Sequence, residues 1–432
     1  MVNTREIALD CIIEILEKKQ YSHQVIKQVL DKYGYLDKRD RSFIKRVTEG
    51  TIERCIELDY ILNLYSKVPV SKMKPVIRSI LRMGVYQLLY MDGVPDSAVC
   101  NESVKLAAKR GLAGLKGFVN GVLRAVAKQK GKIPYPDRKE DLESCLSLTY
   151  SMPSWIVERW LASYGEEQTE EILNGLLAER PLTIRIKEGL SPDEKQELLE
   201  EMNRIGIEAE QIKELPYAYW IKGADRVEAI PGFLAGKCFV QDAGAIAIIE
   251  AAEIEPHQHI IDVCAAPGGK ALHAAEKLQG TGMVMARDVS EHKVLLMEEN
   301  MKRSGLANIK AQVQDARILR KEEIQKADLV IADLPCSGLG VIGRKADIKY
   351  RIVPEDIEKT VDLQRRILSV VWQYVKPGGK LLYSTCTLTE EENHGNAAWL
   401  CENFPFKLIK ERTFLPGKDG TDGFYLAVLT KK

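Results

Sequence analysis

Two cysteines stand in short motifs that each follow a predicted strand, and both have the setting of a reactive thiol. Cys336 lies in DLPCSG (residues 333–338), and Cys386 lies in YSTCT (residues 383–387). In open α/β sheets, ligands bind outside the carboxyl ends of the strands, so both thiols are predicted to face a ligand. A thiolate in that position can act as a nucleophile that forms a covalent intermediate. The alternative for either residue is a small, buried side chain with a structural role.

Such a thiol pair could modify carbon 5 of a cytosine, which is a poor nucleophile because it belongs to an aromatic ring. A thiolate that adds to carbon 6 breaks the aromaticity and lets carbon 5 take up a methyl group. The carbon-5 proton must then leave and the enzyme thiol must be eliminated, and a second thiol could assist that step. Lys270 and nearby helix N-termini could lower the pKa of the attacking thiol. Asp333 could hydrogen-bond the N3/N4 edge of the ring.

A loop rich in small residues follows the first strand of the predicted sheet. Residues 260–264 form this strand, and AAPGGK (265–270) leads into a helix, so backbone amides can approach a ligand closely. A tight turn would explain the glycines equally well, and neither GxGxxG nor GxxxxGK[ST] is present. However, the next three strands each end in an aspartate, at Asp288, Asp315 and Asp333. Each could be a helix N-cap, but together they favour a nucleoside, with Asp288 on the ribose and Asp315 on the adenine edge.

The C-terminal part of the chain must position these residues, and there strands and helices alternate. Residues 236–432 are predicted to form a Rossmann-like α/β domain, an open and mostly parallel sheet with helices on both faces. The strands are predicted at residues 259–264, 282–287, 309–314, 328–332, 379–384 and 424–430.

Three further segments are predicted before this domain. Residues 1–133 have apolar side chains at helical spacing and are predicted to form a bundle of five to seven helices. Residues 134–150 have the composition of a linker. Residues 151–235 are predicted to form a small α+β module, with helices at 155–164, 167–177 and 192–206 and strands at 182–186 and 218–221.

The charge of the 432-residue chain is balanced overall, with 62 basic and 62 acidic side chains, but it is unevenly distributed. Residues 1–140 hold 26 Lys and Arg against 16 Asp and Glu, and residues 98–136 hold eight basic side chains and one acid. This local excess is typical of a surface that binds phosphates, so RNA is a candidate partner. A solvated helix face is the alternative. The candidate RNA-binding residues are Lys105, Lys109, Arg110, Lys116, Arg124 and Lys128.

The nine cysteines form no CxxC pair, so neither a disulfide framework nor a zinc site is predicted, and no metal is expected. Five of them are interpreted as small apolar residues: Cys11, Cys55, Cys100, Cys145 and Cys401. No run of about 20 apolar residues is present, so we expect no membrane partner and a cytoplasmic location. The sequence leaves the oligomeric state open; we expect a monomer.

Four segments of the C-terminal part resemble the Sun/NOL/NSUN-type family of RNA cytosine-C5 methyltransferases. They are CAAPGGK (264–270), DLPCSGLGVIGRKADIKYR (333–351), YSTCTLTEEEN (383–393) and DGFYLAVL (422–429). The resemblance implies a class I fold that binds S-adenosylmethionine, with Cys386 as the nucleophile, Cys336 assisting product release and Asp333 in the catalytic site. It also implies a set of cofactor contacts: Cys264, Ala265, Ala266, Pro267, Gly268, Gly269, Lys270, Asp288, Asp315 and Asp333.

The N-terminal part resembles a NusB-type helical RNA-binding domain, chiefly in residues 36–53 and 81–110. A NusB-type domain joined to this catalytic domain is the arrangement of bacterial methyltransferases that act on 16S ribosomal RNA, which the resemblance implies as the partner. The chain departs from the family pattern at four positions that bear on substrate positioning. They are Leu334 for Ala, Ala346 for Pro, Tyr350 for Trp and Ala271 for Thr.

Two other functions are the alternatives to this one. A methyltransferase of the same fold that acts on an amino nitrogen would carry a D/N-P-P-Y/F/W loop after the fourth strand, where this chain has Asp-Leu-Pro-Cys-Ser. A non-catalytic RNA-binding or ribosome-assembly factor would use only the helical part. The presence of the three strand-end aspartates, Lys270 and both cysteines argues against that second function.

Overall fold

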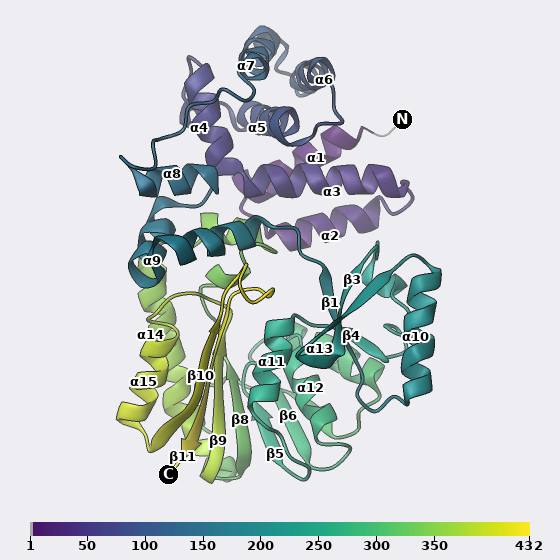
Figure 1. Ribbon diagram of the computed structural model, residues 1–432, viewed down its shortest axis with the longest axis vertical. Coiled ribbons are helices and arrows are strands. Elements are labelled where there is room, and N and C mark those ends of the chain that lie inside the picture. Colours follow the sequence, from purple (N-terminus) through teal and green to yellow (C-terminus); the bar gives the residue numbers. More distant parts are fainter. Residues whose placement is uncertain (1–2) are drawn as a thin grey trace. The chain divides into compact units, whose positions relative to one another are not determined.

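The computed structural model describes residues 3–432, which fold into two compact units (Figure 1). The first unit consists of the residues up to Asn174 together with Ile342–Arg351. The second unit consists of Gly175–Val341 and Ile352–Lys432. No described helix is both long and apolar enough to cross a membrane.

The first unit is helical, and α5 is its central helix. Most of α5 is buried, and it packs so closely on α7 that a Cβ added at Gly84 would lie 2.7 Å from the side chain of Leu123. The predicted bundle is therefore confirmed, with seven α-helices before residue 133 in the described chain. The α-helices of this unit are α1 Thr4–Ile12, α2 Ser22–Lys32, α3 Lys38–Glu53, α4 Cys55–Tyr65, α5 Pro75–Tyr90, α6 Asp96–Lys109, α7 Lys116–Lys128, α8 Leu142–Thr149 and α9 Ser154–Leu177, which kinks at Gly165 and ends in the second unit.

The segment Ile342–Arg351 comes from the C-terminal part of the sequence but is packed inside the helical unit. The Nζ of Lys349 donates hydrogen bonds to the backbone oxygens of Glu53 (2.7 Å) and Ser151 (2.6 Å). Burial lowers the pKa of Lys349 to about 8, against the opposing influence of the Glu53 carboxylate. The helical unit therefore includes a segment that begins six residues after Cys336.

The second unit begins with a small four-stranded antiparallel sheet in the order β2-β3-β1-β4. It consists of β1 Leu182–Ile186, α10 Pro192–Arg204, β2 Glu208–Ile212, β3 Leu215–Lys222 and β4 Cys238–Val240. Ser191 and Glu194 form a capping box at the start of α10. The predicted strands at 182–186 and 218–221 and the helix after Pro192 are present. β2 was not predicted because four of its five side chains are exposed, so it lacks an apolar alternation.

The seven-stranded sheet of the second unit has the order β10-β11-β9-β8-β5-β6-β7. The pairs among β5 to β9 are parallel, while β10 and β11 are antiparallel to their neighbours. This confirms the Rossmann-like sheet and all six predicted strands. The strands are β5 His259–Asp262, β6 Met283–Asp288, β7 Ile309–Val313, β8 Ala327–Asp333, β9 Val375–Thr385, β10 Phe406–Phe414 and β11 Phe424–Lys431. β10 was missed because it is an edge strand with mostly exposed side chains.

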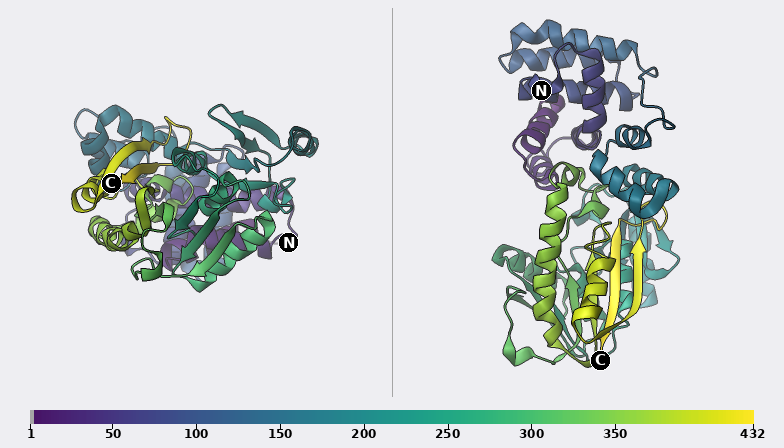
Figure 2. Two further views of the ribbon diagram at one scale, coloured as in Figure 1. Left: turned by 90° about the horizontal axis from the view of Figure 1, so that it is seen from below. Right: turned by 90° about the vertical axis from the view of Figure 1, so that its left-hand side faces the viewer.

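Helices cover both faces of this sheet (Figures 1 and 2). One apolar core joins the strands to α11 Ala243–Ala251, α12 Gly269–Lys277 and α13 Glu291–Ser304. The core on the other face contains α14 Pro354–Val371 and α15 His394–Asn403. Because β5, β6, β8 and β9 run parallel, their carboxyl ends meet at one edge. That edge carries the residues that end these strands, Asp262, Asp288, Asp333 and Thr385.

Candidate active site

The two predicted cysteines lie side by side at the carboxyl edge of the sheet. β8 and β9 are adjacent parallel strands in which Asp333 is paired with Ser384, and the two thiol loops follow directly. The Sγ atoms of Cys336 and Cys386 are 3.2 Å apart, and the backbone N–H of Cys386 donates to the Sγ of Cys336 at 3.3 Å. This separation exceeds the about 2.05 Å of a disulfide, so the two cysteines are not joined by one and their thiols lie within hydrogen-bond distance.

A lysine and an aspartate form an ion pair beside the two thiols. The Nζ of Lys270 donates to Oδ2 of Asp333 at 2.7 Å, and the hydroxyl of Ser384 donates to Oδ1 at 2.7 Å. Burial alone would lower the pKa of Lys270, but the Asp333 carboxylate and the negative charge that Cys386 can carry raise it above its usual value. A firmly held ammonium close to a thiol favours the thiolate form, as a nucleophile requires.

The thiol of Cys336 has the opposite tendency. Its hydrogen bond with Cys386, its burial and the negative charges of Cys386 and Glu392 all raise its pKa well above the usual value. These influences favour the protonated form of Cys336.

The loop between β5 and α12 has the geometry expected of a ligand-binding turn. Gly268 is the N-cap residue of α12 and has φ of 104°, a backbone conformation that glycine adopts without a steric penalty. The backbone N–H of Gly268 donates to the backbone oxygen of Ala265 at 2.7 Å, which closes the turn. The N-terminal amides of α12 thus lie at the sheet edge, where they can receive an anionic group.

The predicted aspartates do not all have the same surroundings. Asp288 is buried at the end of β6, where its Oδ1 accepts the backbone N–H of Ser290 at 3.0 Å. Asp315 follows β7 and is held by the Arg317 guanidinium at 2.7 Å, which lowers the pKa of Asp315. Burial raises the pKa of Cys264, and the nearby carboxylates of Asp262, Asp288 and Asp333 raise it further. Asp288 and Asp333 thus lie close to Cys264. Each of the three aspartates has a basic partner: Lys293 for Asp288 (3.5 Å), Lys270 for Asp333 (2.7 Å) and Arg317 for Asp315 (2.7 Å).

Asp262 is a site residue that the sequence analysis missed. Its side chain is fully buried, its Oδ1 accepts the backbone N–H of Cys264 at 3.3 Å, and its Oδ2 has no hydrogen-bond partner among the described residues. Burial first, and then the charges of Asp333 and Asp288, raise the pKa of Asp262 to about 8. A buried acceptor without a partner, close to the carboxylates of Asp333 and Asp288, suits a positively charged ligand. Asp262 and Asp288 are therefore candidate residues for holding a ligand that combines a cationic group with a nucleoside.

Three family models match consecutive parts of the chain. The NusB family matches residues 2–128, a ferredoxin-like domain of RsmF/B-like methyltransferases matches 152–228, and the family 16S rRNA methyltransferase RsmB/F matches 250–430. A probable ribosomal RNA small subunit methyltransferase B of Bacillus subtilis is 34% identical over all of this chain and 99% of its own length. The chain belongs to the ribosomal RNA small subunit methyltransferase B family.

Further relatives agree with this assignment. The small subunit methyltransferase B of Klebsiella pneumoniae is 30% identical over all of this chain and 99% of its own length. The crystal structure of PH0851 is 25% identical, covers all of this chain and 99% of that one, and has a TM-score of 0.83. A methyltransferase homologue from Pyrococcus horikoshii shares the fold over 66% of this chain and 98% of its own (24% identity, TM-score 0.59). The predicted family, NusB-type domain and S-adenosylmethionine cofactor are therefore confirmed.

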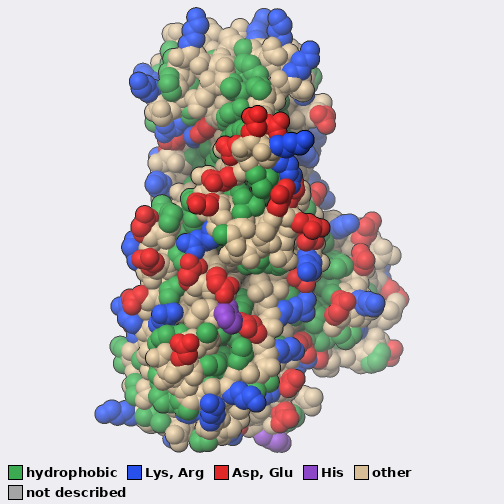
Figure 3. Space-filling model, turned by 60° about the vertical axis from the view of Figure 1, so that its left-hand side comes forward, with side chains coloured by type: hydrophobic (Ala, Val, Ile, Leu, Met, Phe, Trp, Pro, Cys, Tyr) green, Lys and Arg blue, Asp and Glu red, His purple; other side chains and the backbone are tan. Residues whose placement is uncertain are grey.

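Of the six basic residues predicted to bind RNA in this methyltransferase, two lie on α6, Arg110 is the C-cap residue of α6, and three lie on α7. Three of them form ion pairs with acids: Lys105 with Glu102 (2.8 Å), Lys109 with Glu6 (2.5 Å) and Arg110 with Asp10 (2.6 Å). Lys116, Arg124 and Lys128 are exposed on α7, and among the described residues no acid forms an ion pair with them. Lys and Arg side chains stand apart from one another at this end of the helical unit (Figure 3). Their contact with RNA stays a prediction.

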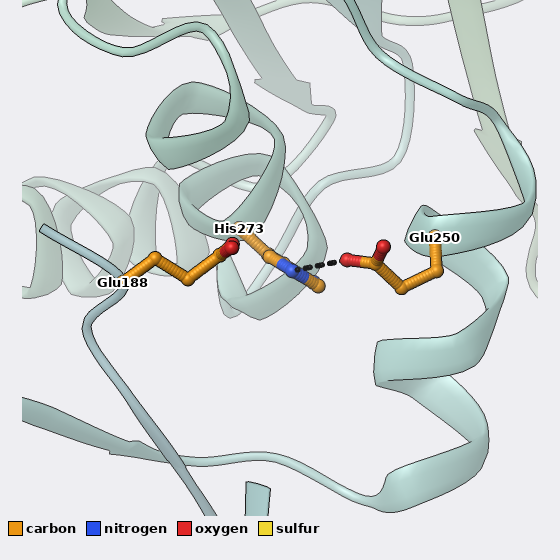
Figure 4. A group of neighbouring side chains, drawn as sticks. All are labelled: Glu188, Glu250 and His273. Carbon is orange, nitrogen blue, oxygen red and sulfur yellow. Dashed lines mark ion pairs between the residues drawn. The ribbon is translucent and has the colours of Figure 1, made fainter. Parts of the chain in front are cut away.

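A second polar cluster lies at the back of α12, where Glu188, Glu250 and His273 have the spacing of metal ligands (Figure 4). The ammonium of Lys277 already occupies the cationic position, at 2.6 Å from Glu250 and 2.9 Å from Glu188. Burial lowers the pKa of His273 to about 3, so its ring is neutral. The cluster is therefore interpreted as a polar contact that joins the small antiparallel module to α11 and α12.

Proposed function

We propose that this protein methylates carbon 5 of a cytosine in 16S ribosomal RNA, with Cys386 as the covalent nucleophile and Cys336 assisting release of the product. The observation that carries this proposal is the pair of reduced thiols, 3.2 Å apart, that follow the ends of two adjacent strands. The lysine that favours a thiolate lies beside them, and the relatives named above are methyltransferases of the small ribosomal subunit. We also propose that the protein acts in the cytoplasm, on ribosomal RNA, and as a monomer.

The reaction begins when the Cys386 thiolate forms a bond from its sulfur to carbon 6 of the cytosine, and the electrons of the C5=C6 double bond move toward carbon 5. S-adenosylmethionine supplies a methyl group that a carbon nucleophile can accept. After the transfer, a base removes the proton from carbon 5, the double bond re-forms, and Cys386 leaves as a thiolate. The protonated Cys336 thiol lies 3.2 Å from the leaving sulfur, so it can donate a hydrogen bond to the departing Cys386 thiolate and ease cleavage of the carbon–sulfur bond.

Asp333 is suited to hold the cytosine edge. Its carboxylate is held by Lys270 and Ser384 and has further lone pairs available. A carboxylate accepts a hydrogen bond from the N4 amino group of cytosine, and this bond orients the ring over the thiols. Leu334 and Ala346, which depart from the family pattern, lie outside this set of polar contacts. We therefore expect the chemistry to be unaffected by the departures.

The test is the Cys336→Ala variant, incubated with 16S ribosomal RNA and S-adenosylmethionine. If Cys336 assists release, elimination stalls and a protein–RNA adduct stable to denaturation appears as a shifted band on a gel. The double variant Cys336→Ala/Cys386→Ala is the control and must form no adduct. Bisulfite sequencing of RNA treated with the wild-type protein must also show a protected cytosine. Absence of both the adduct and the protected cytosine would refute the proposal.

A further inference from the structure

A fully buried glutamate, Glu392, lies behind the two thiol loops. Its carboxylate accepts the backbone N–H of Ser337 (2.8 Å), the hydroxyls of Ser337 (2.6 Å) and Thr389 (2.7 Å), and the side-chain amide of Gln364 (3.2 Å). No Lys, Arg or His among residues 3–432 forms an ion pair with it. Burying a carboxylate without a cationic partner is costly, and at Glu392 four hydrogen bonds from neutral donors offset part of that cost.

These hydrogen bonds connect the two thiol loops. Ser337 follows Cys336 directly, and its Oγ lies 2.6 Å from the Oγ1 of Thr387, which follows Cys386. Asn393, the neighbour of Glu392, donates to the backbone oxygen of Thr387 at 3.1 Å. The position of one sulfur relative to the other is therefore set by a polar network that includes Glu392.

The charges around the thiol pair are arranged asymmetrically. The hydrogen bond with Cys386, burial and the charge of Cys386 raise the pKa of Cys336, and the Glu392 carboxylate raises it further. Against the effect of burial, Asp333 raises the pKa of Lys270, and the charge of Cys386 adds to this, so the Cys386 thiol and the ammonium interact. One thiol thus has an anion behind it, and the other has a cation beside it. A proton shared by the two sulfurs is drawn toward the anion.

We propose that Glu392 is a positioning residue that holds the Cys336 loop against the Cys386 loop and keeps the proton of the thiol pair on Cys336. Cys386 is thereby left as the thiolate before RNA binds. Glu392 is enclosed by protein and acts through Ser337, without touching the substrate. The inference rests on the proposed roles of the two cysteines, but the location of the proton can be measured without RNA.

The experiment measures the alkylation rate of each cysteine in the full-length protein by iodoacetamide as a function of pH, with peptide mass spectrometry to separate the nine cysteines. In Glu392→Gln, the midpoint for Cys336 should fall below that of the wild type, since a neutral amide no longer stabilises its proton. The methylation rate should fall by about tenfold or more, with an unchanged Kd for S-adenosylmethionine. Glu390→Gln removes an exposed charge two residues away and is the matched control.

Two further variants separate charge from packing. Glu392→Asp keeps the charge, so the Cys336 midpoint should stay within a few tenths of a unit of wild type while the rate falls. Ser337→Ala removes the hydroxyl link but keeps the carboxylate, and it replaces Glu392→Gln if that variant does not fold. In Ser337→Ala the rate should fall with the midpoint unchanged.

An unchanged Cys336 midpoint in folded Glu392→Gln would overturn the proposal, as would an unchanged rate in Ser337→Ala. Full methylation by Cys386→Ala would instead refute the proposed function. The alkylation profile would still report on Glu392 in that case, so the two failures are distinguishable.

Discussion

The sheet edge of the catalytic unit and the α6–α7 surface of the helical unit both carry lysines paired with acids, but the pairs differ in kind. The Lys270 side chain is 13% exposed and its acid also binds Ser384, whereas the Lys109 side chain is 62% exposed and has a single glutamate partner. An exposed pair contributes about 0.2–1 kcal/mol and is screened by salt, while a buried charge is costly to leave without its partner. The Lys270–Asp333 pair holds an ammonium in one position beside the two thiols. The exposed Lys109 ammonium can exchange its glutamate for a phosphate.

The largest effect is expected at the sheet edge. Cys386→Ala should lower the rate of methyl transfer from labelled S-adenosylmethionine to 16S ribosomal RNA by about 10³-fold or more, since the nucleophile is lost. The Kd for the cofactor, measured by calorimetry, should not change. Cys401→Ala, which removes a thiol outside the site, is the control and should keep full activity. A Cys386→Ala variant as active as that control would show that the thiol is not the nucleophile.

The sheet edge was also the part of the fold that the sequence predicted well. The strands end in polar residues at regular intervals, so Asp288, Asp333 and both cysteines could be assigned to one edge from the order of the strands alone. Asp262 and Glu392 were missed because their importance lies in burial and in partners that are distant in the sequence. A motif shows which residue type is present, but it does not show which buried oxygen lacks a partner.

The helical unit shows a different limit of sequence analysis. Its helices follow from apolar periodicity, but nothing local indicates that Ile342–Arg351 packs inside it. The buried contacts of Lys349 with Glu53 and Ser151 span about 300 and 200 residues of chain. Likewise, basic side chains can be counted from the sequence, but the sequence does not show that Lys105, Lys109 and Arg110 form ion pairs with acids. Long-range pairing is a tertiary property that periodicity does not encode.

The next effect concerns the pH dependence of cofactor binding at the sheet edge. The pKa of Asp262 is raised to about 8, so this carboxyl is protonated at pH 7 in the ligand-free protein. A cationic ligand favours the carboxylate, so binding of S-adenosylmethionine should release a proton and should tighten between pH 6 and pH 8, by at most about tenfold per unit. Calorimetry in two buffers with different ionisation enthalpies measures the released proton. Asp262→Asn should release none and should bind more weakly.

The same shift predicts the sign of a stability effect. A carboxyl whose pKa is about 8 when folded and close to 3.8 when unfolded binds more protons in the folded state between these two values. The free energy of unfolding of the ligand-free protein should therefore fall as the pH rises from about 4 to 8. Asp262→Asn should flatten this part of the profile, measured by urea denaturation. A wild-type profile retained by Asp262→Asn would exclude Asp262 as its source.

A smaller effect is expected when the exposed charges of α7 are removed. The triple variant Lys116→Gln, Arg124→Gln and Lys128→Gln should reduce the slope of log K for RNA against log salt by about 0.7–0.9 for each phosphate that α7 no longer neutralises. The catalytic rate at saturating RNA should be unchanged. Lys105, Lys109 and Arg110 offer the matched comparison, and their replacement by Gln should reduce the slope less, because acids already neutralise them. Equal slopes for wild type and the α7 triple variant would remove α7 from the RNA-binding surface.

The smallest effect is expected at glycines of the helical unit, where two matched substitutions should have opposite signs. Gly121 is exposed within α7, and a Cβ added there would meet no described atom within 4 Å. Gly121→Ala should therefore raise the free energy of unfolding by about 0.5–1 kcal/mol, since alanine has the higher helix propensity. Gly84→Ala on α5 should lower it, because the new Cβ would lie 2.7 Å from the Leu123 side chain. Urea denaturation measures both. Gly121→Ala could stabilise the helix and yet weaken RNA binding in the salt titration above. That result would show that RNA approaches the backbone of α7 at Gly121 too closely to leave room for a Cβ.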